Sequence, residues 1–404
     1  MLSAPATDAT PGPRVTPLTL RQAAVIFALL VVAGIPHYRI LDAALPLAGD
    51  VDLDGQMKLH GIEADPGLRA ALGWFIGDDP QRVHTFRPVP AFSLWVEYRL
   101  WGWTRWPYLV MNLLYMLLTA LTLVWLCRIL RMPLPFAAGA GALLMLDVTR
   151  GSGGVIGGLA TRHDILCVLF CLLALCSMLL YLDFGSRRHL AGLVVWSLLA
   201  YLSKEMALAL LPICAVIALA HWRRRPSRRI ALVCVSALAV ALVWLGWYRL
   251  AELNMAPAPH DSHSFSGMVE LLHRRWPRNV FLYVASLCRP LALVWVYLSH
   301  IGGWALVSDH RFPRALVRIA MTVLAIVLLM RRRPRWVVVL YVWKVFSYLP
   351  VLPLSDAWGW YEYMPHVLDP ILPLGFAWVV WEPLGLRDRL LRAWAQRRRS
   401  CDAA

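Results

Sequence analysis

Long apolar runs recur from one end of this chain to the other, and no other feature constrains its fold as strongly. A helix that crosses a membrane needs about 20 mainly apolar residues, because the hydrocarbon core is about 30 Å thick. Most of the runs lack the polar face of an amphipathic helix in a soluble protein. The sequence therefore predicts an all-α, polytopic integral membrane protein with about ten transmembrane helices. Their expected positions are roughly 20–38, 107–130, 134–150, 163–184, 189–203, 206–221, 230–250, 315–330, 336–354 and 366–384.

Basic residues gather between particular pairs of runs, and their distribution predicts the orientation. Lys and Arg number 40 against 24 acidic residues, which gives a net charge of +16. Short cytoplasmic loops carry an excess of Lys and Arg. The basic clusters at 221–229, 331–335 and 397–399 all lie on the same side of the membrane if the apolar segment 280–299 enters the bilayer without crossing it. We therefore expect both termini in the cytoplasm and 280–299 as a re-entrant or interfacial segment. The alternative is that 280–299 crosses the membrane.

These features divide the chain into three parts. Residues 1–19 are expected to be a disordered cytoplasmic N-terminus, 20–384 a transmembrane domain with a long first outer loop at 39–106, and 385–404 a basic cytoplasmic tail. Apolar residues make up 59% of the chain and charged residues 16%, against about 45–50% and about 25% in soluble domains. An ordinary soluble enzyme is therefore excluded. Nucleic-acid binding is excluded too, because no basic patch occurs on a soluble module.

Ionisable residues concentrate on the expected outer face. The loop 39–106 is the most polar part of the chain, and three shorter turns bring charged or aromatic groups to the membrane edge, at 157–164, 203–205 and 360–365. Charged side chains cost about 2.5–3.5 kcal/mol each at the centre of a membrane helix and are usually functional or paired. Four such clusters on one face favour a functional site over simple anchoring.

Simpler explanations exist for each cluster taken alone. The outer loop could be a solvated acidic loop whose stretch 91–103 forms a helix lying flat on the membrane. The pairs Arg162/Asp164 and Lys204/Glu205 could neutralise each other at helix ends. Tyr361 and Tyr363 could belong to an interfacial aromatic belt.

The order of short motifs along the chain resembles a known family. Asp52-Leu-Asp54 in the first outer loop is followed by Phe86-Arg-Pro88, Asn112, Arg162-His-Asp164 and Ser203-Lys-Glu205. This series, which covers roughly residues 40–215, is similar to the GT-C class of polyprenyl-phosphate-dependent glycosyltransferases, in particular the protein O-mannosyltransferase-like superfamily in its bacterial branch. The resemblance implies a GT-C-like fold with a long first outer loop.

The resemblance also implies roles for individual residues. Asp54 is the expected catalytic base for the acceptor hydroxyl, with Asp52 as second candidate. The residues expected to bind the donor phosphate are Arg87, Arg162 and Lys204. The residues expected to orient those cations or to line the pocket are His84, Asp164, Glu205, Tyr361 and Tyr363. We expect no metal and no cofactor, because Asp52 and Asp54 are not accompanied by a complete set of cation ligands.

The function that follows is an inverting glycosyltransferase of the bacterial inner membrane with a periplasmic active site. Its expected donor is a sugar linked to undecaprenyl phosphate, and its acceptor an envelope glycan such as O-antigen, the lipid A of lipopolysaccharide, or a protein. Two alternatives belong to other classes. A transporter or flippase of a lipid-linked saccharide would explain Asp147 and Lys344 within predicted spans. A non-catalytic subunit of a glycosylation complex would explain why Trp360 stands where relatives carry Arg.

Overall fold

The structure is a computed structural model, and it describes residues 18–35, 53–78, 80, 85–146, 158–159, 161–221, 226–255, 323–348 and 363–381. Within these ranges the chain is helical and forms no strand. The prediction of an all-α protein is confirmed for this part of the chain. The segment 280–299 lies outside it.

The described residues fold into a series of helices. In chain order they are α1 (Leu20–Gly34), α3 (Leu53–Ala64), α4 (Leu68–Gly73), α5 (Pro88–Trp101), α6 (Arg105–Ile129), α7 (Leu134–Leu146), α9 (Arg162–Phe184), α10 (Arg187–Tyr201), the 3₁₀ helix η2 (Glu205–Ala209), α11 (Leu210–Ala220), α12 (Ser227–Glu252), α16 (Pro334–Tyr348), α17 (Tyr363–His366) and α18 (Ile371–Trp381).

Each of the ten predicted apolar runs overlaps helical residues of the structure; for the run 315–330 these are residues 323–332, which precede α16. Among the described helices, α6, α9 and α12 are long and apolar enough to cross a membrane, while α1, α7 and the segment Glu205–Ala220 are apolar but shorter. This supports a membrane protein. The count of ten crossings and the orientation of the termini stay predictions.

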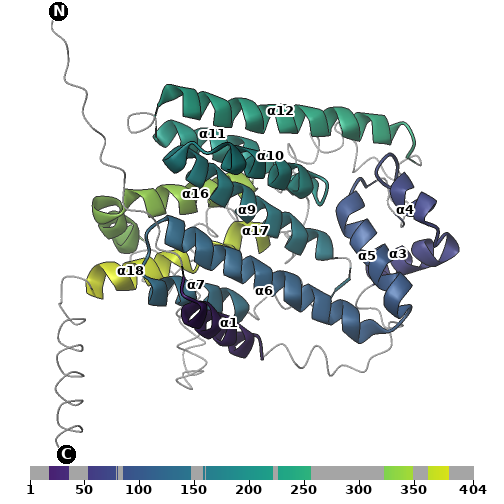
Figure 1. The fold of residues 1–404 in the computed structure, drawn as a ribbon, viewed down its shortest axis with the longest axis horizontal. Helices are drawn as coiled ribbons and strands as arrows, with labels where there is room; N and C mark the ends of the chain where they lie inside the picture. Colours follow the sequence, from purple (N-terminus) through teal and green to yellow (C-terminus); the bar gives the residue numbers. More distant parts are fainter. Residues whose placement is uncertain are drawn as a thin grey trace, which may run out of the picture.

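Helix α9 lies at the centre of the bundle and determines how the other helices pack. It contacts α6, α10, α11 and α12, and Figure 1 shows it between α6 and α10. Nearly all of its side chains are buried, including Cys167, Cys171 and Cys176, which pack as small apolar groups. Arg162, His163 and Asp164 form its first turn and are also buried. The polar start of α9 is therefore enclosed by protein.

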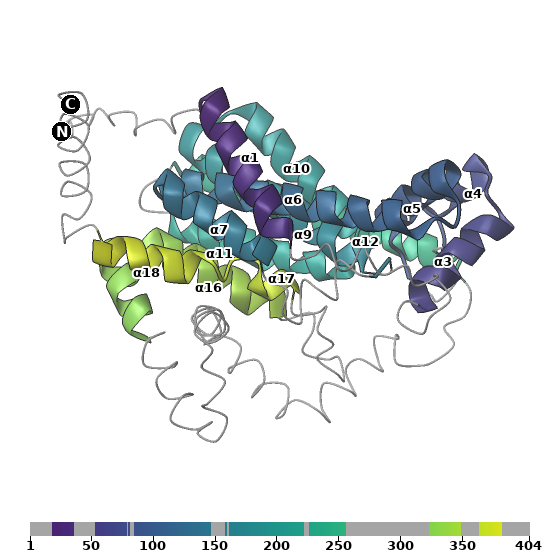
Figure 2. The same ribbon diagram turned by 90° about the horizontal axis from the view of Figure 1, so that it is seen from below.

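Helices α3, α4 and α5 form a smaller layer at one end of the bundle, which both views show (Figure 1, Figure 2). They share an apolar core that includes Leu59, Trp74 and Leu94. The far end of α12 supports this layer, because the Trp247 indole N–H donates to the carbonyl of Phe75 over 2.6 Å. Much of the predicted outer loop 39–106 is thus a packed helical layer.

Helix α5 confirms that a helix forms over most of the stretch 91–103. Pro88 at its first position fits a helix start, because proline there lacks only an N–H that would have no partner in the helix. Ala91, Leu94 and Glu97 form its buried stripe, whereas Leu100 is exposed. The prediction that this helix lies flat on a membrane is not tested by the structure.

Close packing of α7 against α1 and α6 depends on Gly141. A side chain at this position would meet Cγ2 of Val124 at 2.7 Å and Cδ2 of Leu30 at 3.0 Å. We expect Gly141→Val to destabilise the bundle by about 1–3 kcal/mol, because overpacked cores must shift neighbouring groups. The matched control is Gly246→Val on α12, whose new side chain would meet nothing within 4 Å. Thermal unfolding in detergent should show a lower midpoint for the Gly141 variant only, and equal midpoints would contradict this packing.

Candidate functional site

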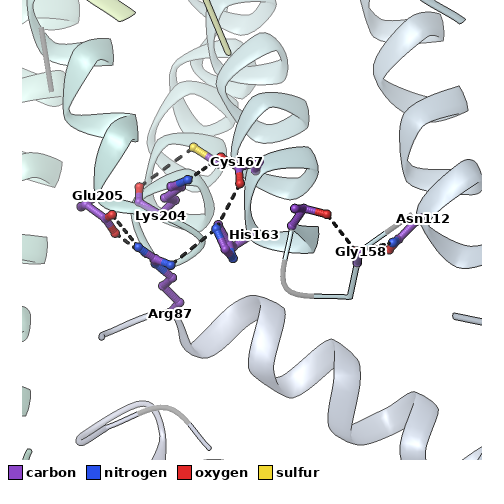
Figure 3. A network of polar contacts seen from close by, with 9 residues as sticks. Arg87, Asn112, Gly158, His163, Cys167, Lys204 and Glu205 are labelled. Atoms are coloured by element: carbon purple, nitrogen blue, oxygen red, sulfur yellow. Dashed lines mark hydrogen bonds and ion pairs between the residues drawn. The ribbon is translucent and has the colours of Figure 1, made fainter. Parts of the chain in front are cut away.

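A cluster of polar residues forms where three separate segments meet. Arg87 lies at the N-cap of α5, His163 and Asp164 lie in the first turn of α9, and Lys204 and Glu205 lie where η2 begins. We call these five residues the polar cluster. Figure 3 shows the side chains of Arg87, His163 and Glu205 pointing toward one another. The chain between α5 and η2 is more than 100 residues long, so only the tertiary fold brings these groups together.

Arg87 and Glu205 form a two-pronged ion pair. The Arg87 Nη2 atom donates to Oε1 of Glu205 over 2.6 Å, and its Nε atom donates to Oε2 over 3.1 Å. Such a fork is the geometry in which arginine binds carboxylates and phosphates best. The Arg87 side chain is 15% exposed and that of Glu205 is 48% exposed, so this pair is open on one side.

Asp164 connects the buried residue Lys204, through His163, to the partly exposed ion pair of Arg87 and Glu205. One carboxylate oxygen, Oδ1, accepts from the ammonium of Lys204 at 2.5 Å, and Oδ2 lies 3.0 Å from Nε2 of His163. The same ring nitrogen of His163 lies 3.4 Å from Nη1 of Arg87. Asp164 and Lys204 are almost fully buried, so each neutralises a charge that would be costly alone.

Arg162 lies beside the polar cluster but points to other partners. Its guanidinium is fully buried and forms an ion pair with Oε2 of Glu97 at 2.6 Å. It also donates to Oδ1 of Asn112 at 2.9 Å and to the carbonyl of Tyr108 at 3.1 Å. Burial raises the pKa of Glu97, and the Arg162 guanidinium opposes that rise. Arg162 therefore joins α5, α6 and α9.

The observed ion pairs are not the ones that the simpler explanation suggested, in which two charges at the same helix end neutralise each other. Instead of Arg162 with Asp164 and Lys204 with Glu205, the structure joins Arg162 to Glu97, Lys204 to Asp164 and Arg87 to Glu205. Successive helical residues point about 100° apart, so Arg162 and Asp164 face different neighbours. Every one of these pairs links two segments of the chain.

The remaining predicted site residues are placed only in part. Asp52, His84 and Tyr361 lie outside the described residues. Asp54 lies in the first turn of α3 and Tyr363 at the start of α17, but their side chains are not described. In the described part of the chain, no group of three His, Cys, Asp or Glu side chains is arranged to hold a metal ion.

Two groups of polar residues were not predicted from the sequence as parts of a site, although Lys344 was noted within a predicted span. Glu97 was missed because it stands in an aromatic-rich stretch, although its spacing from Ala91 and Leu94 places it on the buried stripe. The second group contains Lys344, His366 and Asp369. The Lys344 ammonium donates to Asp369 over 2.7 Å, and both side chains are fully buried. A buried lysine in a predicted span signals that a carboxylate partner exists.

Comparison with known proteins gives one match. The family model described as dolichyl-phosphate-mannose-protein mannosyltransferase matches residues 80–247. No curated protein and no solved structure matches the chain. The matched segment contains Arg87, His163, Asp164, Lys204 and Glu205, so the whole polar cluster lies inside it, together with Arg162. The resemblance to the GT-C class of glycosyltransferases that the motifs indicated is therefore confirmed over residues 80–247.

Proposed function

We propose that the protein is an inverting glycosyltransferase that takes a sugar from a polyprenyl-phosphate donor and passes it to an acceptor on the periplasmic face of a bacterial inner membrane. An envelope glycan is the favoured acceptor. The observation that carries the proposal is the partly open Arg87 fork, set in a polar cluster inside the segment that matches the mannosyltransferase family. A donor of this class carries a phosphate that must be held while its bond to the sugar breaks.

The three cations that were predicted to bind the donor phosphate differ in how accessible their side chains are. Arg87 is the most accessible of them, and its partner Glu205 is half exposed. Lys204 and Arg162 are buried behind Asp164 and Glu97. We therefore assign direct phosphate contact first to Arg87. Lys204 and Arg162 lie at the same end of the bundle as buried ion pairs, and we assign them a supporting electrostatic role toward the departing phosphate in a low-dielectric site.

The proposed reaction needs a base for the acceptor. Asp54, or Asp52 in second place, takes the proton of the acceptor hydroxyl, whose oxygen forms a bond to the anomeric carbon. The bond from that carbon to the phosphate oxygen breaks at the opposite face, and the phosphate leaves with the electron pair, so the configuration inverts. Asp54 lies on α3, which packs against α5, the helix that begins next to Arg87. His84, Tyr361 and Tyr363 are proposed to line the pocket.

A flippase for a lipid-linked saccharide is the second candidate function. The observation that favours it is the fully buried Lys344–Asp369 ion pair, because charged groups within transmembrane helices often mark a transport path. Movement of the lipid-linked sugar across sealed vesicles in the absence of acceptor would support this function. Sugar transfer in detergent, where no compartments exist, would support the glycosyltransferase. A non-catalytic subunit would show neither activity.

Asp54→Asn should abolish sugar transfer without preventing folding. The amide cannot take the acceptor proton, and a positioned base contributes about 10²–10⁴-fold to the rate. The control is Asp65→Asn, which changes an exposed aspartate just beyond the end of the same helix, α3. Transfer from undecaprenyl-phosphate sugar should fall for the first variant and stay near wild type for the second. Undiminished transfer by the Asp54→Asn protein would disprove the assignment of the base.

Arg87→Lys should weaken donor binding although it keeps the positive charge. The ammonium cannot reproduce the two parallel N–H bonds of the guanidinium, and charged hydrogen bonds contribute about 1.5–3 kcal/mol each, which corresponds to a loss of roughly 10- to 100-fold. The control is Arg99→Lys at an exposed position of α5. Binding of undecaprenyl phosphate to purified protein in nanodiscs measures both variants. Equal affinities would argue against a phosphate contact at Arg87.

A further inference from the structure

We propose that Glu97 is a positioning residue, which acts through Arg162 to hold Arg87 where it meets the donor phosphate. The inference rests on the proposed function and adds to it a residue that the motifs do not include. Glu97 does not belong to the polar cluster. Its influence on Arg87 follows from the helix that the two residues share and from two consecutive residues of α9.

Arg87 and Glu97 lie near opposite ends of α5. Arg87 is the N-cap, and Glu97 comes ten residues later, which corresponds to about 15 Å along a helix that rises about 1.5 Å per residue. A helix of this length moves as a rigid rod. A contact that fixes its second half therefore also fixes the direction in which its first residue projects.

Two neighbouring residues of α9 hold the two ends of α5. Arg162 binds Glu97 at 2.6 Å, and His163 lies 3.4 Å from the Arg87 guanidinium. Arg162 cannot follow Glu97 if α5 shifts, because it also donates to Asn112 and to the Tyr108 carbonyl on α6. Asn112 in turn donates to the carbonyl of Gly158 over 3.0 Å. The position of α5 is thus defined relative to α6 and α9.

Apolar packing alone would not define that position as closely. Leu94 and Ala91 bury the same stripe of α5, but hydrophobic contact is non-directional, so a small rotation or slide changes it little. The ion pair joins two nearly inaccessible side chains whose charged atoms lie 2.6 Å apart, so a slide or rotation of α5 would separate charges that have no access to water. A buried ion pair is weak evidence for stability, and its best-attested use is to select one register of packing. Here the selected register is the one that brings Arg87 to Glu205.

The test uses undecaprenyl phosphate as the probe and measures its dissociation constant with protein in nanodiscs. The variants are Glu97→Gln, Arg87→Gln and the double variant. We expect each single change to weaken binding about tenfold or more, as the loss of one charged contact does. The double variant should bind no more weakly than the weaker single variant, because both changes act through the same guanidinium. The inference would be overturned if the losses of affinity caused by the two changes multiplied in the double variant. It would also be overturned if the Glu97→Gln protein bound the probe as tightly as the wild type.

A matched control separates positioning from a general loss of stability. Asp183→Asn removes a carboxylate near the opposite end of α9, where Asp183 meets Arg335 at 3.4 Å. Its thermal midpoint should fall while its affinity for the probe stays that of the wild type. Loss of affinity in this variant equal to that of Glu97→Gln would show that stability, not position, governs binding.

Two further outcomes distinguish a failure of the proposed function from a failure of this inference. If the wild type does not bind undecaprenyl phosphate, or if Arg87→Gln binds it as well as the wild type, the proposed phosphate site fails. If Arg87→Gln weakens binding and Glu97→Gln does not, only the positioning role fails. Should Glu97→Gln not fold, Glu97→Asp replaces it, because it keeps the charge but shortens the side chain. Binding that is weaker than wild type supports the inference, and wild-type binding overturns it.

Discussion

Charge buried at the start of α9 is the constraint on which the rest of this site depends. Arg162 and Asp164 lie almost fully inside a bundle made of apolar helices. An uncompensated charge in such surroundings is far more costly than a paired one, so each must find a partner of opposite sign. The partners come from α5 and from the residue that precedes η2. The need to pair these charges therefore fixes where the smaller helical layer and the η2 turn lie.

The apolar runs were sufficient to predict where helices form, because the length and uniform hydrophobicity of a run are local properties. Arg87, Asp164, Lys204 and Glu205 of the polar cluster were also predictable from the motifs, whereas His163 was not assigned a role. The pairing of the charges was not predictable, and the alternative in which Arg162 and Asp164 neutralise each other illustrates the reason. Both residues belong to one helix turn, but the direction of each side chain depends on neighbours that are 40 or more residues away in sequence. Glu97 was missed because it stands in an aromatic-rich stretch, and its partner Arg162 lies 65 residues further along the chain.

The buried cluster of Lys344, His366 and Asp369 shows a related arrangement in a later part of the chain. Asp369 binds Lys344 at 2.7 Å and His366 at 2.5 Å, and α17, which ends at His366, contacts both α16 and α9. Trp343 is also buried and donates to the carbonyl of Met364 over 2.8 Å. In both places a lysine inside the bundle is neutralised by an aspartate from another segment. Paired charges thus join helices whose apolar faces could pack in several ways.

The three consecutive residues at the start of α9 have a consequence for how this sequence can vary. Arg162 and His163 contact opposite ends of α5 and Asp164 contacts Lys204, so their directions matter as well as their identities. Insertion or deletion of one residue in this turn would rotate all three by about 100° and break every contact at once. A substitution changes one of these residues at a time, whereas a change in the length of this turn alters the contacts of all three. Homologous chains that keep these pairings must therefore keep the spacing of this turn even where the surrounding apolar residues differ.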